Sequence, residues 1–273
     1  MNKRKNYILQ ILLIATCLLM ALSCEEVITI DLNSSNPKIV IEGTVTDQPG
    51  PYTVIISETA DYYNPEAQPM ISGARVTISD SEGNIDHLSE ISPGVYETDS
   101  LQGILGRTYT LLVEANGKTY RAESTMPVAI EIDSLYFTQE KRRPHQNKDS
   151  YQVVCVFTDH SGKEDFCRLK VYRNDEIELS YGMYNGRLTD GNTIEFDRIR
   201  GDFELNDMVK VELFSIDEAT YTYYSTLKDV LASDPQRMMS TSVPANPVTN
   251  ITGDALGYFG TFTVRADSII IKK

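Results

Sequence analysis

The residue with the clearest chemical assignment is a cysteine that follows a short apolar segment near the start of the chain. Basic residues at 3–5 precede an apolar run over 8–22, and Ala-Leu-Ser stands directly before Cys24. This order is typical of a secretory signal peptide with its cleavage point. The thiol of Cys24 would accept a diacylglycerol, and cleavage would free its amine for acylation. The sequence therefore predicts a lipoprotein signal peptide over 1–23, lipidation at Cys24 and an acylated tether over 24–36.

Lipidation at this cysteine would hold the rest of the chain at a membrane. A single acyl chain binds a membrane marginally, whereas several, each contributing about 0.8 kcal/mol per buried CH₂, anchor a protein permanently. The apolar run is shorter than the roughly 20 residues that a membrane span needs, so an uncleaved anchor is the less favoured interpretation. Glu25 and Glu26 follow the lipid site and suit either a solvated tether or an export signal for the outer leaflet.

Two further cysteines are expected to face each other. Alternating apolar positions over 151–158 and 166–172 indicate two strands, and residues 159–163 supply turn chemistry, so a hairpin is predicted. Its register places Cys155 opposite Cys167 on one apolar side. In an oxidising compartment they could form a disulfide, closing a short loop worth roughly 3 kcal/mol. A shift of register would leave two buried thiols instead.

Oxygen-bearing residues on alternate positions form a second candidate. Asp80, Glu82, Asn84 and Asp86 could together suit a hard cation such as Ca²⁺. Ile85 stands where a calcium loop of the EF type needs glycine, so a plain hairpin turn is the favoured interpretation. No Cys/His spacing suits zinc, and we predict no bound metal and no cofactor.

No motif predicts an enzyme. The three histidines (His87, His145 and His160) lie in or beside polar turn segments without a catalytic spacing, which favours surface imidazoles. No nucleotide-binding glycine motif and no serine elbow occur. We therefore predict no catalytic residue and leave the ligand-binding residues unknown. The paired carboxylates of a glycan hydrolase stay open, because a sequence gives no separation between them.

Charge excludes one class of partner. The chain of 273 residues carries 39 acidic and 25 basic residues, a net charge of −14. Such a protein repels the phosphate backbone, so nucleic acid is not expected as a partner. Removal of residues 1–23, which carry three basic residues, would bring the net charge to −17. The basic cluster Lys141-Arg142-Arg143 lies in a polar stretch, and a solvated loop is favoured there over an anion or headgroup patch.

The elements of the first half read as short strands between turns. Alternating apolar residues over 37–46 and 52–57, with further runs after them, predict a β-sandwich domain over 37–127. Asn116-Gly117 suits a type I′ turn, because both residues tolerate positive φ. The resulting hairpin is expected to place Tyr109, Leu111 and Val113 opposite Ser124, Ala122 and Tyr120.

The second half, 128–273, is predicted to be a β-rich domain with one amphipathic helix near 216–233. Ser215 and Glu218 fit a capping box at its start. Three tyrosines of this helix (Tyr221, Tyr223 and Tyr224) could stack on a ligand, although packing of the helix on a sheet is the favoured interpretation. Irregular chain is expected over 238–260, and closing strands over 261–271.

Several segments occur together in the order found in one known family. They include CEEVITIDL (24–32), PKIVIEGTVTD (37–47), FTDHSGKEDFCRLKVY (157–172) and PANPVTNITGDALGYFGTFTV (244–264). With these segments the mature chain resembles the domain of unknown function family 4249 of Bacteroidota lipoproteins over essentially its whole length. Its first half also resembles carboxypeptidase-regulatory-like sandwiches of the transthyretin type, which are Ig-like in architecture.

The resemblance implies a cellular location but no reaction. It implies an outer-membrane lipoprotein that is exposed at the cell surface, with the periplasmic leaflet as the alternative, and that is encoded near TonB-dependent receptors. It implies no established activity. We expect a non-catalytic binding or assembly accessory of a TonB-dependent outer-membrane transporter, with membrane contact through the N-terminal lipid. The alternatives are a surface adhesion or structural lipoprotein and, less favoured, a glycan hydrolase.

Overall fold

The computed structural model describes residues 37–60, 68–139, 150–178, 182–232 and 246–272. The predicted signal peptide, Cys24 and the tether lie outside the described residues, as do His145 and Lys141-Arg142-Arg143. The described chain is mainly β, with a β-sandwich followed by a second β-rich region and one helix, as the sequence predicts.

The first sandwich has two sheets. The first sheet has the order β4 (Ile85–His87), β3 (Arg75–Asp80), β7 (Thr108–Ala115) and β8 (Lys118–Thr125). The second contains β1 (Ile39–Thr46), β2 (Thr53–Glu58), β6 (Val95–Glu97) and β5 (Ser89–Ser92). Alternate residues of both sheets are buried in one core, which includes Ile41, Val54, Ile78 and Leu111. Burial of one face per strand explains the alternating sequence pattern.

The hairpin of β7 and β8 confirms the most specific local prediction. Asn116 and Gly117 have φ values of 51° and 71°, as a type I′ turn requires. The predicted pairs form: Tyr109 with Ser124, Leu111 with Ala122, and Val113 with Tyr120. Turn chemistry therefore fixes the register of this ribbon.

The second region also has two layers. One is the sheet β14 (Thr193–Phe203), β10 (Tyr151–Thr158) and β9 (Ile132–Gln139). The other contains β12 (Glu176–Ile177), β13 (Gly182–Asn185), β11 (Phe166–Arg173), β15 (Met208–Ile216) and β16 (Leu256–Ile270). Their shared core includes Val153, Phe157, Leu169 and Leu213, each fully buried.

The predicted hairpin of 151–158 with 166–172 is wrong. β10 pairs with β9 and β14, whereas β11 pairs with β12, β13 and β15, so the turn after β10 carries the chain from one sheet to the other. Cys155 and Cys167 therefore approach the core from opposite sheets, and both are buried free thiols in the structure. Local alternation could not distinguish a hairpin from such an arch, because both bury one face of each strand.

β16 joins the two regions. Residues 256–262 run parallel to β1, and residues 263–270 run antiparallel to β15, so one nine-stranded sheet extends through both regions. Phe259 of this strand lies in the first core, whereas Ile269 packs against the second. The sequence predicts irregular chain up to Gly260, but the strand begins at Leu256. The domain division after Pro127 stays a prediction, since the closing strand contributes to both sides of it.

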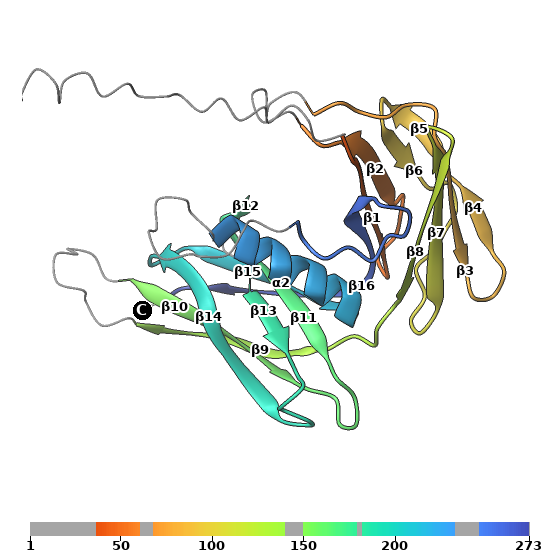
Figure 1. Cartoon of the computed structure of the whole chain (residues 1–273). Helices are drawn as coiled ribbons and strands as arrows, with labels where there is room; N and C mark the ends of the chain where they lie inside the picture. The colour runs from red at the N-terminus through yellow and green to blue at the C-terminus, as the bar shows by residue number, and fades with distance from the viewer. Residues whose placement is uncertain (1–36, 61–67, 140–149, 179–181, 233–245, 273) are drawn as a thin grey trace, which may run out of the picture. The chain divides into compact units, whose positions relative to one another are not determined.

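Helix α2 (Glu218–Ala232) lies against the face of the sheet that contains β11, β15 and β16 (Figure 1). The predicted capping box is wrong. The Asp217 carboxylate caps the helix by accepting the Thr220 N–H at 2.8 Å, whereas the Ser215 hydroxyl lies in β15 and accepts the Ile130 N–H. The spacing of Ser215 and Glu218 fits a capping box. Asp217 is an equally good N-cap residue, however, and it stands directly before the first residue of the helix.

A test of β16 follows from Gly257, whose φ is +93° and whose added Cβ would lie 2.0 Å from the Ile41 carbonyl oxygen. Gly257→Ala is expected to lower the free energy of unfolding by on the order of 3 kcal/mol or more. The alanine would be strained at this positive φ, and the backbone of Ile41 would also have to move away from its Cβ. Gly73→Ala is the matched control: its φ is +74° with nothing within 4 Å, so only about 1–2 kcal/mol of left-handed strain is expected. Urea unfolding measures both. Equal losses in the two variants would contradict the close approach.

Candidate functional site

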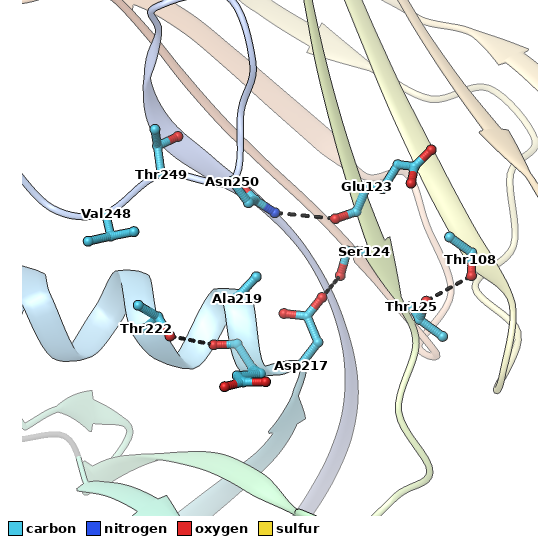
Figure 2. A pocket seen from close by; sticks show the side chains of 11 residues that line it. Thr108, Glu123, Ser124, Thr125, Asp217, Ala219, Thr222, Val248, Thr249 and Asn250 are labelled. Atoms are coloured by element: carbon cyan, nitrogen blue, oxygen red, sulfur yellow. Dashed lines mark hydrogen bonds between the residues drawn. The ribbon is translucent and has the colours of Figure 1, made fainter.

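The larger described pocket lies where the first sandwich meets helix α2. It has a cavity volume of about 550 Å³. Figure 2 shows side chains from the β7–β8 ribbon, the start of α2 and the segment 248–250 around it. The lining residues are Thr108, Glu123, Ser124, Thr125, Asp217, Glu218, Ala219, Thr222, Val248, Thr249 and Asn250.

A buried hydroxyl network forms the base of this pocket. The Ser124 hydroxyl donates to the Asp217 carboxylate at 2.5 Å and lies 2.9 Å from the Thr261 hydroxyl. It also accepts the Thr261 N–H at 2.9 Å. Because Asp217 caps α2 with its other oxygen, one serine connects β8, β16 and the helix start. Sequence reasoning missed this network, since its members are far apart along the chain.

Asn250 closes a neighbouring side of the pocket by acting as a strand partner. Its side-chain oxygen accepts the Phe259 N–H at 3.0 Å, and its amide donates to the Phe259 carbonyl at 2.7 Å. The same amide also reaches the Glu123 carbonyl (Figure 2). The asparagine thus satisfies the backbone N–H and carbonyl of Phe259 in β16.

The charged residues of this pocket are also partnered. Glu123 pairs with Arg121 at 2.5 Å, and Glu218 pairs with Arg187. Ser124, Asp217 and Asn250 are likewise hydrogen-bonded within the protein. These three side chains connect β8, β16 and the start of α2, and we call them the polar joint. The described contacts identify no catalytic group in the pocket.

A smaller pocket of about 340 Å³ contains part of the acidic motif that the sequence singles out. The Asp80 carboxylate accepts the N–H groups of Glu82 and Asn84 and the Arg107 guanidinium at 2.6 Å. Burial acts to raise the pKa of Asp80, but these hydrogen bonds outweigh it, so the pKa lies below its ordinary value. The Asp80 carboxylate therefore stabilises the turn of the β3–β4 hairpin, and both of its oxygens already accept hydrogen bonds.

Asp86 has a similar role in the same pocket. Its carboxylate accepts the backbone N–H groups of Asp99, Ser100 and Leu101, so it fastens the loop after β6 to β4. Donors occupy the oxygens that a cation would need. Within the described ranges no group of three or more metal-ligating side chains could hold a metal ion. These contacts favour the hairpin interpretation over the calcium alternative.

The titratable groups near the β10–β11 connection form a third cluster. Asp159 is 2% exposed, accepts the Thr189 hydroxyl at 3.2 Å, and faces Asp165. Burial, then the hydrogen bond and charge of Asp165, raise the pKa of Asp159 to about 6. His160 is half-buried beside them, with Nδ1 at 2.7 Å from Asp165, whereas His87 is exposed. Neither described pocket includes this pair.

The remaining candidates are buried structural groups. Burial raises the pKa of Cys155 to about 12 and that of Cys167 well above its ordinary value, so both are protonated thiols. Tyr223 and Tyr224 are buried between α2 and the sheet, which confirms the packing interpretation. The Tyr224 hydroxyl is buried as well and donates to the Tyr258 hydroxyl at 2.6 Å.

Comparison with known families identifies the family of the chain. The model described as "Domain of unknown function (DUF4249)" matches residues 25–268. The chain belongs to the DUF4249 family. This match includes both sandwiches and β16 as far as residue 268, and it confirms the family drawn from the sequence segments. The comparison with curated proteins gives no match.

Solved structures similar to this DUF4249 chain are remote. A segment of two fibronectin type-III domains from chicken tenascin shares 13% identity, covers 66% of this chain and 91% of its own, and has a TM-score of 0.22. The Yersinia pseudotuberculosis adhesin InvE shares 14% identity, covers 65% of this chain and 55% of its own, and has a TM-score of 0.21.

The polar joint of this DUF4249 chain can be tested at Asp217. Asp217→Ala removes the acceptor of the Thr220 N–H and of the Ser124 hydroxyl, and is expected to cost about 1–2 kcal/mol of unfolding free energy through the lost cap alone. Asp217→Asn keeps one side-chain oxygen for the helix and should lose less. Urea unfolding with an unchanged m-value checks the difference. If alanine were tolerated as well as asparagine, the joint would be unimportant to stability.

Proposed function

We propose that this protein is a lipid-anchored, non-catalytic binding or assembly component of the cell envelope, held in the outer membrane at Cys24 and working beside a TonB-dependent transporter. The observation that carries the proposal is the signal-peptide pattern that ends at this cysteine. Within the described ranges no helix is long and apolar enough to cross a bilayer.

Charge and chain length support a tethered body. Glu25 to Lys38 separate Cys24 from the start of β1, and a chain of these 14 residues reaches at most about 50 Å when fully extended. A net charge of −17 after cleavage disfavours direct contact of the body with anionic headgroups. Acyl chains would then supply the affinity for the membrane, while the acidic body stays in the aqueous phase.

The described side chains support binding rather than catalysis. Carboxylates in both pockets are held by protein donors, and the two described thiols are buried and protonated. The hydrolase alternative needs a carboxyl pair that reaches a substrate. Asp159 and Asp165 are such a pair by charge, but Asp159 is 2% exposed, so this alternative is not favoured.

Exposed apolar side chains suggest where a protein partner would bind. Ile85 and Ile104 line the smaller pocket and are 63% and 40% exposed. Apolar side chains that gather at an exposed patch are typical of protein interfaces. Together with the transporter association that the family resemblance implies, they make this rim the proposed contact with the receptor. Adhesion to a glycan or to another cell is the alternative role.

Cys24→Ala tests the anchor. The wild-type chain is expected to incorporate labelled fatty acid and to partition into detergent with the membrane fraction, and Cys24→Ala should lose both properties. Cys17→Ala is the matched control, because Cys17 lies inside the apolar run of the signal peptide and should not be required. An unlabelled wild-type chain, or a Cys24→Ala chain that still sediments with membranes, would contradict lipid anchoring.

The receptor association is tested by crosslinking in cells, mild extraction and capture of the tagged lipoprotein. A TonB-dependent receptor is expected to co-purify, and Ile85→Glu with Ile104→Glu should reduce its yield at least severalfold, because burying a carboxylate at an interface costs several kcal/mol. Ile177→Glu is the control, since Ile177 is 58% exposed and lines neither described pocket. Recovery of the lipoprotein alone would contradict the transporter role, and glycan-dependent retention would favour adhesion.

A further inference from the structure

One oxygen in the carboxyl pair of Asp159 and Asp165 lacks a hydrogen-bond donor. Asp159 is 2% exposed, and the side chain of Asp165 is 12% exposed. The Asp159 Oδ2 atom accepts the Thr189 hydroxyl, but its Oδ1 atom is buried without a hydrogen-bond partner. An unpartnered carboxylate oxygen in such a place is costly, because desolvation is not offset by any bond.

The neighbouring carboxyl makes this cost larger. Asp165 lies within hydrogen-bonding reach of Asp159. Two ionised carboxylates both accept hydrogen bonds and repel each other, so they cannot bond directly. One proton resolves both problems, since a protonated Asp159 Oδ1 atom becomes a donor and removes one of the two charges.

The groups around the pair come from several elements. On the same connection, the His160 N–H and Nδ1 both contact the Asp165 carboxylate at 2.7 Å. From β11 the Cys167 thiol interacts with both carboxyls, and from β13 the Tyr184 hydroxyl bonds the Thr189 hydroxyl and also Asp159, which acts to lower the pKa of Asp159. Asp190 accepts the Gly162 N–H. His160 is the only basic side chain among these neighbours.

The pair sits where two connections meet. The connection of residues 159–165 follows β10, and that of residues 186–192 follows β13. The Gly186 N–H donates to the Asp165 carbonyl at 2.8 Å, and the Asp159 N–H donates to the Asn192 carbonyl at 3.0 Å. A Cβ at Gly186 would lie 2.9 Å from the Asp159 Oδ1 atom, so the second connection packs directly on the carboxyl.

We propose that Asp159 and Asp165 share one proton, and that this proton is a clasp that holds the 159–165 connection against the 186–192 connection. Loss of the proton leaves two adjacent buried negative charges beneath Gly186, and the two connections then separate more readily. Acidification closes the clasp and alkalinisation loosens it.

The sign of the effect on stability follows from proton linkage. The folded state keeps a proton on Asp159 up to about pH 6, whereas the unfolded chain loses it near pH 3.9, so the folded state binds more protons between these values. Stability therefore falls as pH rises through this window. Carboxyls whose pKa is lowered on folding, such as Asp80 and Asp207, affect stability only at lower pH.

The test compares the full mature chain at pH 5.0 and 7.5. For wild type, the unfolding equilibrium constant is expected to be about tenfold smaller at pH 5.0. Asp159→Asn carries a permanent N–H donor in place of the proton, and should show no such difference and be at least as stable as wild type at pH 7.5. Hydrogen exchange, corrected for intrinsic rates, should show faster opening at the Gly162 and Gly186 amides of wild type at pH 7.5.

Two variants separate this proton from its neighbours. His160→Asn keeps a nitrogen donor near the position of Nδ1 but does not titrate, so the tenfold difference should persist. Asp99→Asn removes an exposed carboxylate and should behave as wild type. If the pH difference vanished in His160→Asn and survived in Asp159→Asn, the proton would belong to the imidazole and the clasp would be wrong.

A direct titration covers the case in which a variant does not fold. Carboxyl ¹³C resonances of wild type are expected to show Asp159 titrating near pH 6, and ordinary values for both aspartates would overturn the proposal. Addition of Ca²⁺ at pH 7.5 should leave the melting temperature of wild type unchanged. A rise in wild type that is absent in Asp159→Asn would show that the pair takes a metal cation instead of a proton.

Discussion

The fold depends on backbone pairing between the first and last described strands. β16 runs parallel to β1 over residues 256–262 and then antiparallel to β15, and this sequence of partners places both sandwiches on one sheet. Parallel pairing has no local turn to guide it, so this contact must close the whole intervening chain and carries a large cost in loop-closure entropy. Gly257 permits it, because any side chain there would collide with the Ile41 carbonyl.

The position of α2 follows from this strand. Once β16 lies beside β1, its Thr261 meets Ser124 of β8, and the serine hydroxyl reaches the cap residue Asp217. Each of these polar groups is buried or half-buried and would be costly if it lost its partner. The larger pocket is the space that remains around this joint, which explains why polar residues line most of it although they are occupied by one another.

The Asn116-Gly117 turn and the position of the helix were predictable from local sequence, whereas the choice of partner strand was not. Asn116-Gly117 fixes a hairpin by its own backbone preferences, and the helix appears within two residues of its predicted start and one of its predicted end. The arch between β10 and β11 differs from a hairpin only in which sheet receives the second strand, and alternation of apolar residues carries no such information. Asp159 and Asp165 likewise have no motif, because their chemistry arises from burial and from Gly186 and Thr189 of another connection.

Two buried aspartates of this protein show how environment sets the role of one residue type. Asp80 is surrounded by backbone donors and Arg107, which favour the ionised form and make it a permanent acceptor that strengthens the β3–β4 hairpin above acidic pH. Asp159 accepts from the Thr189 and Tyr184 hydroxyls, but it is buried beside a second carboxyl, and burial and that neighbour favour the protonated form. The same side chain therefore stabilises one sandwich when ionised and the other when neutral. Because the two effects have opposite signs, stability should be greatest between their titrations, where Asp80 is already charged and Asp159 still holds its proton.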